Sequence, residues 1–298
     1  MLSCESVKPL CIYHAHCADG FAAAWVVRRH YQGEVEFVPG VHGQPPPEVA
    51  GRDVIFVDFA YRRAVIETMA RAARSILILD HHKSAAEDLA GMAGAASLHV
   101  VMDMNRSGAG LAWDHFFAGR PRPVLLDHIE DFDLGRHALP ASRELMAAVF
   151  SYPYDFAVWD QLVERAQSES SRNGLKAEGE IITRKLARDV DEALTVGTRH
   201  MVIGGLEVSV VNVPPSLAGE AAAVLAAGKP FAAAYFDRAD ARVFSLRSDR
   251  DGLDVAAIAM PPASRSRSDG KATIGGNRED PSAVDQSGRQ SAGGATVT

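Results

Sequence analysis

Histidine and aspartate side chains follow three short apolar runs of this 298-residue chain. The runs are LCIY at 10–13, VIFV at 54–57 and ILIL at 76–79. The nitrogen and oxygen donors that come within a few residues after them are His14, His16, Asp19, Asp58, Asp80, His81 and His82. Several carboxylates brought together repel one another and raise each other's pKa unless a cation lies between them. The pattern therefore predicts a metal site.

The donor types favour Mn²⁺ or Mg²⁺, because a structural zinc site more often takes thiolates in a closed set of four ligands. The segment HIEDFDL at 128–134 supplies two further carboxylates, Asp131 and Asp133. Two ions about 3.5–4 Å apart and bridged by a carboxylate would activate a water molecule and hold the leaving oxygen of a phosphoester. We therefore expect two metal ions and hydrolysis of a phosphoester bond.

Short apolar runs alternate with longer amphipathic stretches in the first half, which predicts an α/β fold with a mostly parallel sheet and flanking helices. The expected strands are 10–13, 35–38, 54–57, 76–79 and 98–101. The expected helices are 21–31, 60–73 and 110–117, and the proline-rich segment 42–51 is expected to be a loop. Because loop residues after neighbouring parallel strands meet at one sheet edge, the donor side chains should lie close together there.

The second half predicts a smaller mixed α/β domain. We expect helices from 123 to about 166, a linker or turn at SESSRNG (168–174), and then a helix with one apolar face. Strands are expected at 201–203, 208–213, 231–236 and 241–246, followed by a short helix at 252–260. Residues 261–298 contain no aromatic residue and no periodic apolar stripe, which predicts a disordered tail.

Composition narrows the classes of protein to consider. With 31 basic and 38 acidic residues the net charge is −7, which argues against a protein that coats duplex DNA or an anionic membrane. Three cysteines cannot form the paired disulfide framework of a secreted domain, so we expect a cytoplasmic location. No run approaches the ~20 apolar residues of a membrane span, so we expect a soluble protein.

Four motifs, HAHCADG, VDF, LDHHKSA and HIEDFDL, occur in this order and together resemble the DHH phosphoesterase superfamily over about 10–260. That family includes RecJ-like exonucleases, nanoRNases, exopolyphosphatases and manganese-dependent pyrophosphatases. The resemblance implies a hydrolase acting on phosphodiester bonds of short single-stranded oligonucleotides or related small nucleotides. The alternatives are a pyrophosphatase or exopolyphosphatase, and a catalytically silent nucleotide-binding protein.

The resemblance also implies roles for individual residues. The implied metal ligands are His14, Asp19, Asp58, Asp80, His81 and Asp131. Asp58 would bridge two ions, Asp80 would be a ligand or support one, and Asp133 is the second choice for the fourth motif. Many relatives have two aspartates two residues apart in the first motif, whereas here Cys17 precedes Asp19. His16 is therefore expected to take part in holding the first ion. His82 is expected to face the substrate phosphate.

The segment NRSG at 105–108 predicts an anion site before a helix. Ser107 can cap that helix while free N–H groups at Gly108 and the Arg106 guanidinium face a phosphate. We therefore expect catalytic roles for His82 and Arg106, and substrate binding by Arg106, Ser107 and Gly108. The alternative is an ordinary capped helix with a solvated arginine. The remaining histidines, His42 among them, are interpreted as surface or core residues.

The expected domains are a DHH phosphoesterase domain at 1–166, a connecting helix at 167–200, a small C-terminal substrate-binding domain at 201–260 and the tail at 261–298. The site is expected in the cleft between the two lobes. The family's C-terminal domain carries a glycine-rich segment ending in histidine, but Gly275 and Gly276 are followed by Asn277. We therefore expect an incomplete domain, and a frameshifted or truncated C-terminus is one hypothesis for it.

Overall fold

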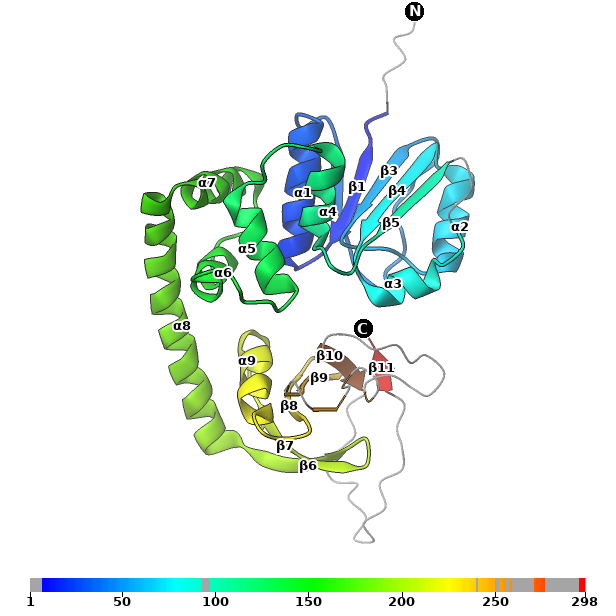
Figure 1. Ribbon diagram of the computed structural model, residues 1–298. Coiled ribbons are helices and arrows are strands. Elements are labelled where there is room, and N and C mark those ends of the chain that lie inside the picture. Colours follow the sequence, from blue (N-terminus) through cyan, green and yellow to red (C-terminus); the bar gives the residue numbers. More distant parts are fainter. Residues whose placement is uncertain are drawn as a thin grey trace, which may run out of the picture. The chain divides into compact units, whose positions relative to one another are not determined.

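The computed structural model describes residues 7–92, 97–239 and 241–249, with 252, 253, 255 and 258 and the backbone of 271–276 and 295–297. The chain divides into two compact units, Met1–Thr183 and Arg184–Thr298. The division falls within helix α8 (Glu169–Gly197), drawn in light green in Figure 1. The predicted domain boundaries are not tested by this division and stay predictions.

The first unit is built on a parallel sheet of five strands in the order β2-β1-β3-β4-β5. Their bounds are β1 Leu10–His14, β2 Glu36–Gly40, β3 Asp53–Val57, β4 Ser75–Asp80 and β5 Leu98–Met102. Each neighbouring pair is parallel, which confirms the expected sheet and its strands. The register pairs His14 with Gly40 and Val57 with Leu79, so the carboxyl ends of the four strands β1 to β4 meet at one edge.

Helices cover both faces of this sheet (Figure 1). Strand residues alternate between two apolar clusters, because successive side chains of a strand point to opposite faces. Cys11, Ile55 and Val57 pack in one cluster with helices α1 and α4, whereas Leu10, Ile12 and Phe56 pack in the other with α2. The helices are α1 Ala18–His30, α2 Arg63–Ala72, α3 Lys83–Asp88, α4 Gly108–Phe116, α5 Val124–Asp133, α6 Ser142–Phe150 and α7 Phe156–Gln167.

The second unit contains a mixed sheet in the order β11-β10-β9-β8-β7-β6. Only the pair β7 and β8 is parallel among the pairs described. Helix α9 (Pro215–Ala226) packs on this sheet together with the apolar face of α8 that contains Leu186 and Val190. The strands are β6 Arg199–Ile203, β7 Leu206–Asn212, β8 Ala232–Asp237, β9 Arg242–Arg247, β10 Lys271–Gly276 and β11 Ala295–Val297. The expected smaller mixed domain is confirmed.

Several expectations differ from the structure. The segment SESSRNG is not a linker, because α8 begins at Glu169 and continues through Gly174. Helix α9 has no counterpart among the predicted elements. The helix predicted at 252–260 and the tail at 261–298 lie mostly outside the described residues, apart from the backbone of β10 and β11. Within the described ranges, no helix combines the length and the apolar character needed to cross a bilayer.

Candidate metal centre

Asp58 lies at the centre of a cluster of donor groups at the carboxyl edge of the parallel sheet. It directly follows β3, and its side chain is 1% exposed. Its Oδ1 is 3.0 Å from Nε2 of His81, and its Oδ2 is 3.3 Å from Nδ1 of His14. Two groups of possible ligands share it, His14–Asp58–His82 and Asp19–Asp58–His81, each with donor atoms within 4.8 Å of one another. One carboxylate is thus common to two possible metal positions.

The backbone at Asp58 is in the left-handed region, with φ +57°. Such a conformation is uncommon for residues other than glycine, although aspartate adopts it more readily than most. The N–H of Asp58 donates to the carbonyl of Leu79 at 2.9 Å, which holds the turn against β4. Helix α4 also comes very close, because a Cβ on Gly108 would lie 2.4 Å from the Asp58 Cβ. The carboxylate is therefore held by the backbone on both sides.

Asp19, in the first turn of α1, is buried against the start of α4. Its carboxylate accepts hydrogen bonds from the backbone N–H groups of Gly108 at 2.5 Å and Ala109 at 2.9 Å. Burial and the charges of Asp58 and Asp133 raise the pKa of Asp19 well above its ordinary value, against opposing effects of His81 and the Ala109 amide. Carboxylates are therefore crowded together here in a buried space.

Asp80, at the end of β4, positions the two histidines that follow it. Its Oδ1 accepts from the N–H groups of His81 at 2.7 Å and His82 at 3.2 Å, and lies 2.7 Å from Nδ1 of His82. The other oxygen, Oδ2, is buried and has no hydrogen-bond partner among the described residues. Buried polar atoms are normally satisfied, so an orphaned carboxylate oxygen fits a site for a cation.

The two histidines carry the positive charge that offsets these carboxylates. Burial lowers the pKa of His81, but the hydrogen bond to Asp58 and the nearby carboxylates outweigh it and raise the pKa to about 10. Burial also lowers the pKa of His82, but the hydrogen bond to Asp80 and the charge of that carboxylate outweigh it and raise the pKa to about 9. Burial raises the pKa of Asp58, yet its contacts with His14 and His81 hold it below the usual range. The cluster thus favours a bound positive charge.

The structure places the two aspartates of the fourth motif differently. Asp131 accepts from the N–H groups of Ala138 at 2.7 Å and Leu139 at 3.2 Å, away from the cluster. Asp133 instead places Oδ2 at 3.5 Å from Nε2 of His81. Residues i and i+2 of a helix lie about 200° apart around its axis. One carboxylate on α5 therefore faces the cluster and the other faces away. Asp133, the second choice, is thus the aspartate of this motif that contacts the cluster, and the ligand role of Asp131 stays a prediction.

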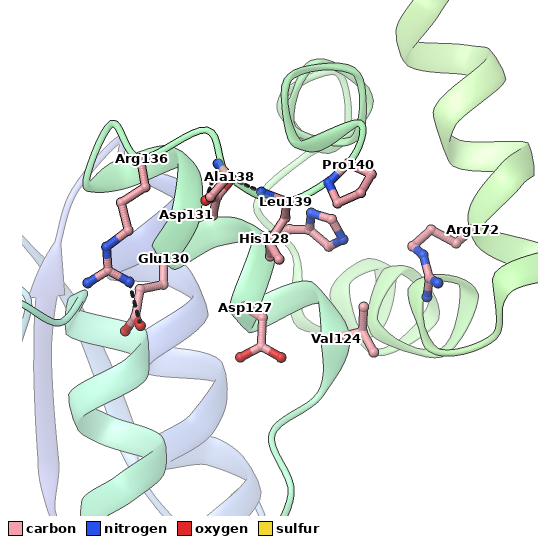
Figure 2. Close-up of a pocket in the computed structure, with 10 residues that line it drawn as sticks. All are labelled: Val124, Asp127, His128, Glu130, Asp131, Arg136, Ala138, Leu139, Pro140 and Arg172. Atoms are coloured by element: carbon pink, nitrogen blue, oxygen red, sulfur yellow. Dashed lines mark hydrogen bonds and ion pairs between the residues drawn. The ribbon is translucent and has the colours of Figure 1, made fainter.

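On its own side of α5, Asp131 lines a cavity of about 550 Å³ (Figure 2). His128, Arg136 and Arg172 also line it, from α5, the loop after it and α8. His128 contacts the Ser142 hydroxyl through Nδ1 at 2.8 Å. Asp131 therefore ties the loop between α5 and α6 to the wall of this cavity.

The structure does not bring His16 into either group of possible ligands. It lies in the turn between β1 and α1, its side chain is exposed, and its φ is +56°. Cys17 precedes the first residue of α1. Burial, followed by the charges of Asp58 and Asp19, raises the pKa of this thiol well above its ordinary value. The thiol form is therefore favoured at neutral pH.

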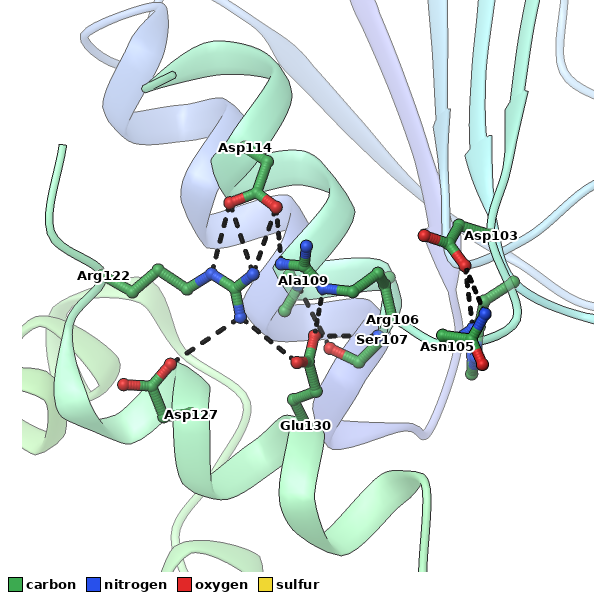
Figure 3. A network of polar contacts seen from close by, with 12 residues as sticks. Asp103, Asn105, Arg106, Ser107, Ala109, Asp114, Arg122, Asp127 and Glu130 are labelled. Atoms are coloured by element: carbon green, nitrogen blue, oxygen red, sulfur yellow. Dashed lines mark hydrogen bonds and ion pairs between the residues drawn. The ribbon is translucent and has the colours of Figure 1, made fainter. Parts of the chain in front are cut away.

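The start of α4 also differs from the expected anion site (Figure 3). Ser107 does cap the helix, since its hydroxyl accepts from the N–H of Gly110 at 3.1 Å. The N–H of Ser107, however, donates to Glu130 at 3.1 Å, and that of Gly108 donates to Asp19. The protein's own carboxylates thus occupy the amides that were expected to receive a phosphate.

Arg106 is likewise engaged by carboxylates of α4 and α5. Its Nε donates to Glu130 at 3.1 Å, and its Nη2 forms an ion pair with Asp114 at 2.5 Å (Figure 3). Neither contact directs the guanidinium toward the donor cluster. In this structure Arg106 therefore joins α4 to α5, and its predicted substrate role stays a prediction.

Sequence reasoning missed His42 at this edge. Its ring centre is 6.1 Å from that of His14 and 4.7 Å from that of Phe59. A signal was present, because His42 follows the second strand as His14 and Asp58 follow the first and third. The three prolines after it indicated a loop but not which way that loop turns.

Comparison with known proteins bears on the fold. No family model matches the chain. It is 24% identical over 169 residues to an uncharacterized protein of Acanthamoeba polyphaga mimivirus, covering 51% of this chain and 39% of that protein, so it spans less than half the length of this relative. RecJ from Thermus thermophilus in complex with Mn²⁺ aligns with a TM-score of 0.44 at 12% identity, covering 85% of this chain and 46% of RecJ. The DHH domain of a protein described as a member of a ribosomal-protein family aligns with a TM-score of 0.51 at 12% identity, covering 82% of this chain and 74% of that chain, which places the fold among DHH-domain structures.

Proposed function

We propose that this protein is a divalent-metal-dependent phosphoesterase that hydrolyses short oligonucleotides or related small nucleotides. The observation that carries the proposal is the sharing of Asp58 by two groups of ligand atoms at the carboxyl edge of a parallel sheet. Ligands of open α/β sheets gather at this edge. A shared carboxylate is the feature by which a protein holds two ions close together.

The residues present fit Mn²⁺ or Mg²⁺. One ion would be held by His14, Asp58 and His82, and the other by Asp19, Asp58 and His81, with Asp133 beside it. The unpartnered Oδ2 of Asp80 supports this assignment, because it offers a buried anionic oxygen without a proton donor among the described residues. When bound, the ions would supply an acidified water molecule and offset the charge on the phosphate.

The chain's own residues contribute orientation and charge. Asp80 fixes the His82 ring through Nδ1, which leaves Nε2 as the nitrogen that can contact either an ion or a substrate oxygen. Asp19 joins the start of α1 to the start of α4, so both helices are held in place at the cluster. Because these groups are already ordered, little reorganisation accompanies the reaction.

The test is Mn²⁺-dependent hydrolysis of a 5′-phosphorylated dinucleotide by the full chain. The wild type should release mononucleotides, the His81→Ala variant should not, and a His200→Ala variant in exposed β6 should match the wild type. Inorganic pyrophosphate is assayed in parallel. Hydrolysis of pyrophosphate alone would replace the nucleotide substrate by the phosphoanhydride alternative. Loss of neither activity in His81→Ala would contradict the proposed site.

A further inference from the structure

His42 is a fourth imidazole at the cluster, and neither group of possible metal ligands contains it. It lies just after β2, whose last residue, Gly40, pairs in register with His14. Its ring packs on Phe59 at 4.7 Å, and Phe59 directly follows Asp58. His42 is nevertheless an exposed residue. His42 therefore stands at the open rim of the site, beside the candidate ligands.

The loop that carries His42 is held in one conformation. The N–H of Gln44 donates to the carbonyl of Val41 at 3.2 Å, which closes a four-residue turn with His42 and Gly43 at its centre. Gly43 has φ +83°, a value suited to glycine at the third position of a type II turn. Three prolines follow at 45–47, each with φ fixed by its ring. A ligand would thus meet an imidazole that is already in place.

The surroundings of His42 differ from those of His81. The guanidinium of Arg62 lies near enough to His42 for its permanent positive charge to act on the imidazole. Arg62 is exposed at the start of α2 and forms no ion pair with a carboxylate among the described residues. The carboxylates Asp19 and Asp133 instead gather around His81. The cluster therefore has an acidic side and a side rich in imidazole and guanidinium groups.

We propose that His42, with Arg62 beside it, binds anionic oxygens of the substrate's phosphate at the rim of the metal site. This inference rests on the proposed function and deepens it, because it assigns the phosphate to the side of His14 and His82. His42 and Arg62 would also supply hydrogen-bond donors that Arg106 does not, because Arg106 is paired with Glu130 and Asp114. Hydrogen bonds to an anionic phosphate oxygen are charge-assisted and therefore strong, and both guanidinium and imidazole N–H groups can donate them.

The experiment compares His42→Ala, His42→Gln and Arg62→Ala in the full chain loaded with Mn²⁺. Matched controls are His200→Ala and Arg71→Ala, the latter in the last turn of the same helix as Arg62. For the 5′-phosphorylated dinucleotide, His42→Ala and Arg62→Ala should each raise KM about ten-fold while kcat changes less than about three-fold. His42→Gln, which retains a donor, should recover part of the loss, and bound Mn²⁺ should stay at the wild-type level.

Two further outcomes would overturn the inference: KM unchanged in both alanine variants, or Mn²⁺ lost from His42→Ala, which would make His42 a metal ligand. Binding of inorganic phosphate to the Mn²⁺-loaded protein is measured separately by ³¹P NMR. If the wild type hydrolyses no dinucleotide, the proposed function is contradicted. If phosphate still binds more weakly to His42→Ala than to that wild type, the rim site is supported. Equal phosphate binding in wild type and variants would remove the rim site even if hydrolysis is observed.

Discussion

Two acidic clusters of the first unit differ in how their charge is balanced. On α4, α5 and their connecting segments, carboxylates face arginines. Glu130 alone pairs with Arg106 and Arg122 (Figure 3) and with Arg136 (Figure 2), at 3.1–3.4 Å. At the sheet edge, the ion pairs of Asp19, Asp58 and Asp80 within the described residues are all with histidines. Arginine is always charged, whereas a histidine can lose its proton and bind a metal.

This difference separates a structural network from a candidate site. The α4–α5 network balances its carboxylates with permanent cations, so it needs nothing from solution. The sheet-edge cluster depends on protonated imidazoles, and a divalent ion can replace their charge. Buried carboxylates therefore indicate a metal site only when arginine or lysine side chains do not already balance their charge.

The largest expected effect comes from removing the carboxylate shared by both ligand groups. Asp58→Asn should abolish Mn²⁺ binding and reduce dinucleotide hydrolysis by about three orders of magnitude, because both positions lose an anionic ligand. Metal analysis of the purified variant and single-turnover rates measure this. The metal-free variant should also unfold more easily than the metal-free wild type, because His14 and His81 lose a buried anionic partner. Retained Mn²⁺ at wild-type stoichiometry would show that Asp58 is not shared.

The next effect distinguishes the two aspartates of α5. Asp133→Asn should lower activity or Mn²⁺ affinity about 10–100-fold, as expected for a group that contacts a metal ligand. Asp131→Asn should leave Mn²⁺ affinity unchanged and cost about 1–3 kcal/mol of unfolding free energy, because its partners are backbone N–H groups. Mn²⁺ titration and urea unfolding of both variants separate these outcomes. The reverse pattern would restore Asp131 as the ligand.

A third change affects the network that is already balanced. Glu130→Gln removes the carboxylate that pairs with three arginines and accepts from the Ser107 N–H. We expect a loss of about 3 kcal/mol in unfolding free energy, measured in urea, with Mn²⁺ affinity unchanged. Asp127→Asn is the matched control, because Asp127 is 47% exposed and its pair with Arg122 is long at 3.7 Å. That variant should lie within about 0.5 kcal/mol of wild type.

The smallest effect is a pH dependence of the metal-free protein. The pKa values of His81 and His82, about 10 and about 9, exceed the ordinary 6.5. A raised pKa stabilises the folded state fully below about pH 6.5, and this contribution is lost as the pH rises through about 9 to 10. Unfolding free energy should therefore fall over this window more steeply than in a His81→Ala/His82→Ala variant. Mn²⁺ binding should release protons, which calorimetry in buffers of different ionisation enthalpy detects.

Much of the first unit could be predicted from its sequence, because β1, β3 and β4 are largely buried and stand out as continuous apolar runs. The order of β1, β3 and β4 then brings His14, Asp58 and Asp80 to one edge without further information. Helix α9 was missed because alanine dominates it and offers little periodic contrast. The polar start of α8 was interpreted as a linker for a similar reason, since Gly174 and its polar neighbours resemble a loop in isolation.

The parts of the site that could not be predicted depend on direction around a helix and on long-range pairing. The choice between Asp131 and Asp133 depends on the rotation of α5, which spacing in one motif does not determine. The occupation of the α4 amides depends on Asp19, almost ninety residues away in the chain. A local motif such as NRSG predicts that backbone N–H groups are available at a helix start. It does not predict which acceptors the tertiary structure brings to those N–H groups.

The left-handed backbone of Asp58 has a consequence for how this protein could change under selection. Glycine adopts φ +57° without the steric cost that any side chain incurs, so a side chain is kept at this turn at some cost to the backbone. The contacts of the carboxylate with His14 and His81 offset that cost, and Asp58→Gly would lose them together with the proposed metal site. Selection for the donor group would therefore retain an unfavourable backbone conformation that selection for an unstrained turn would replace by glycine.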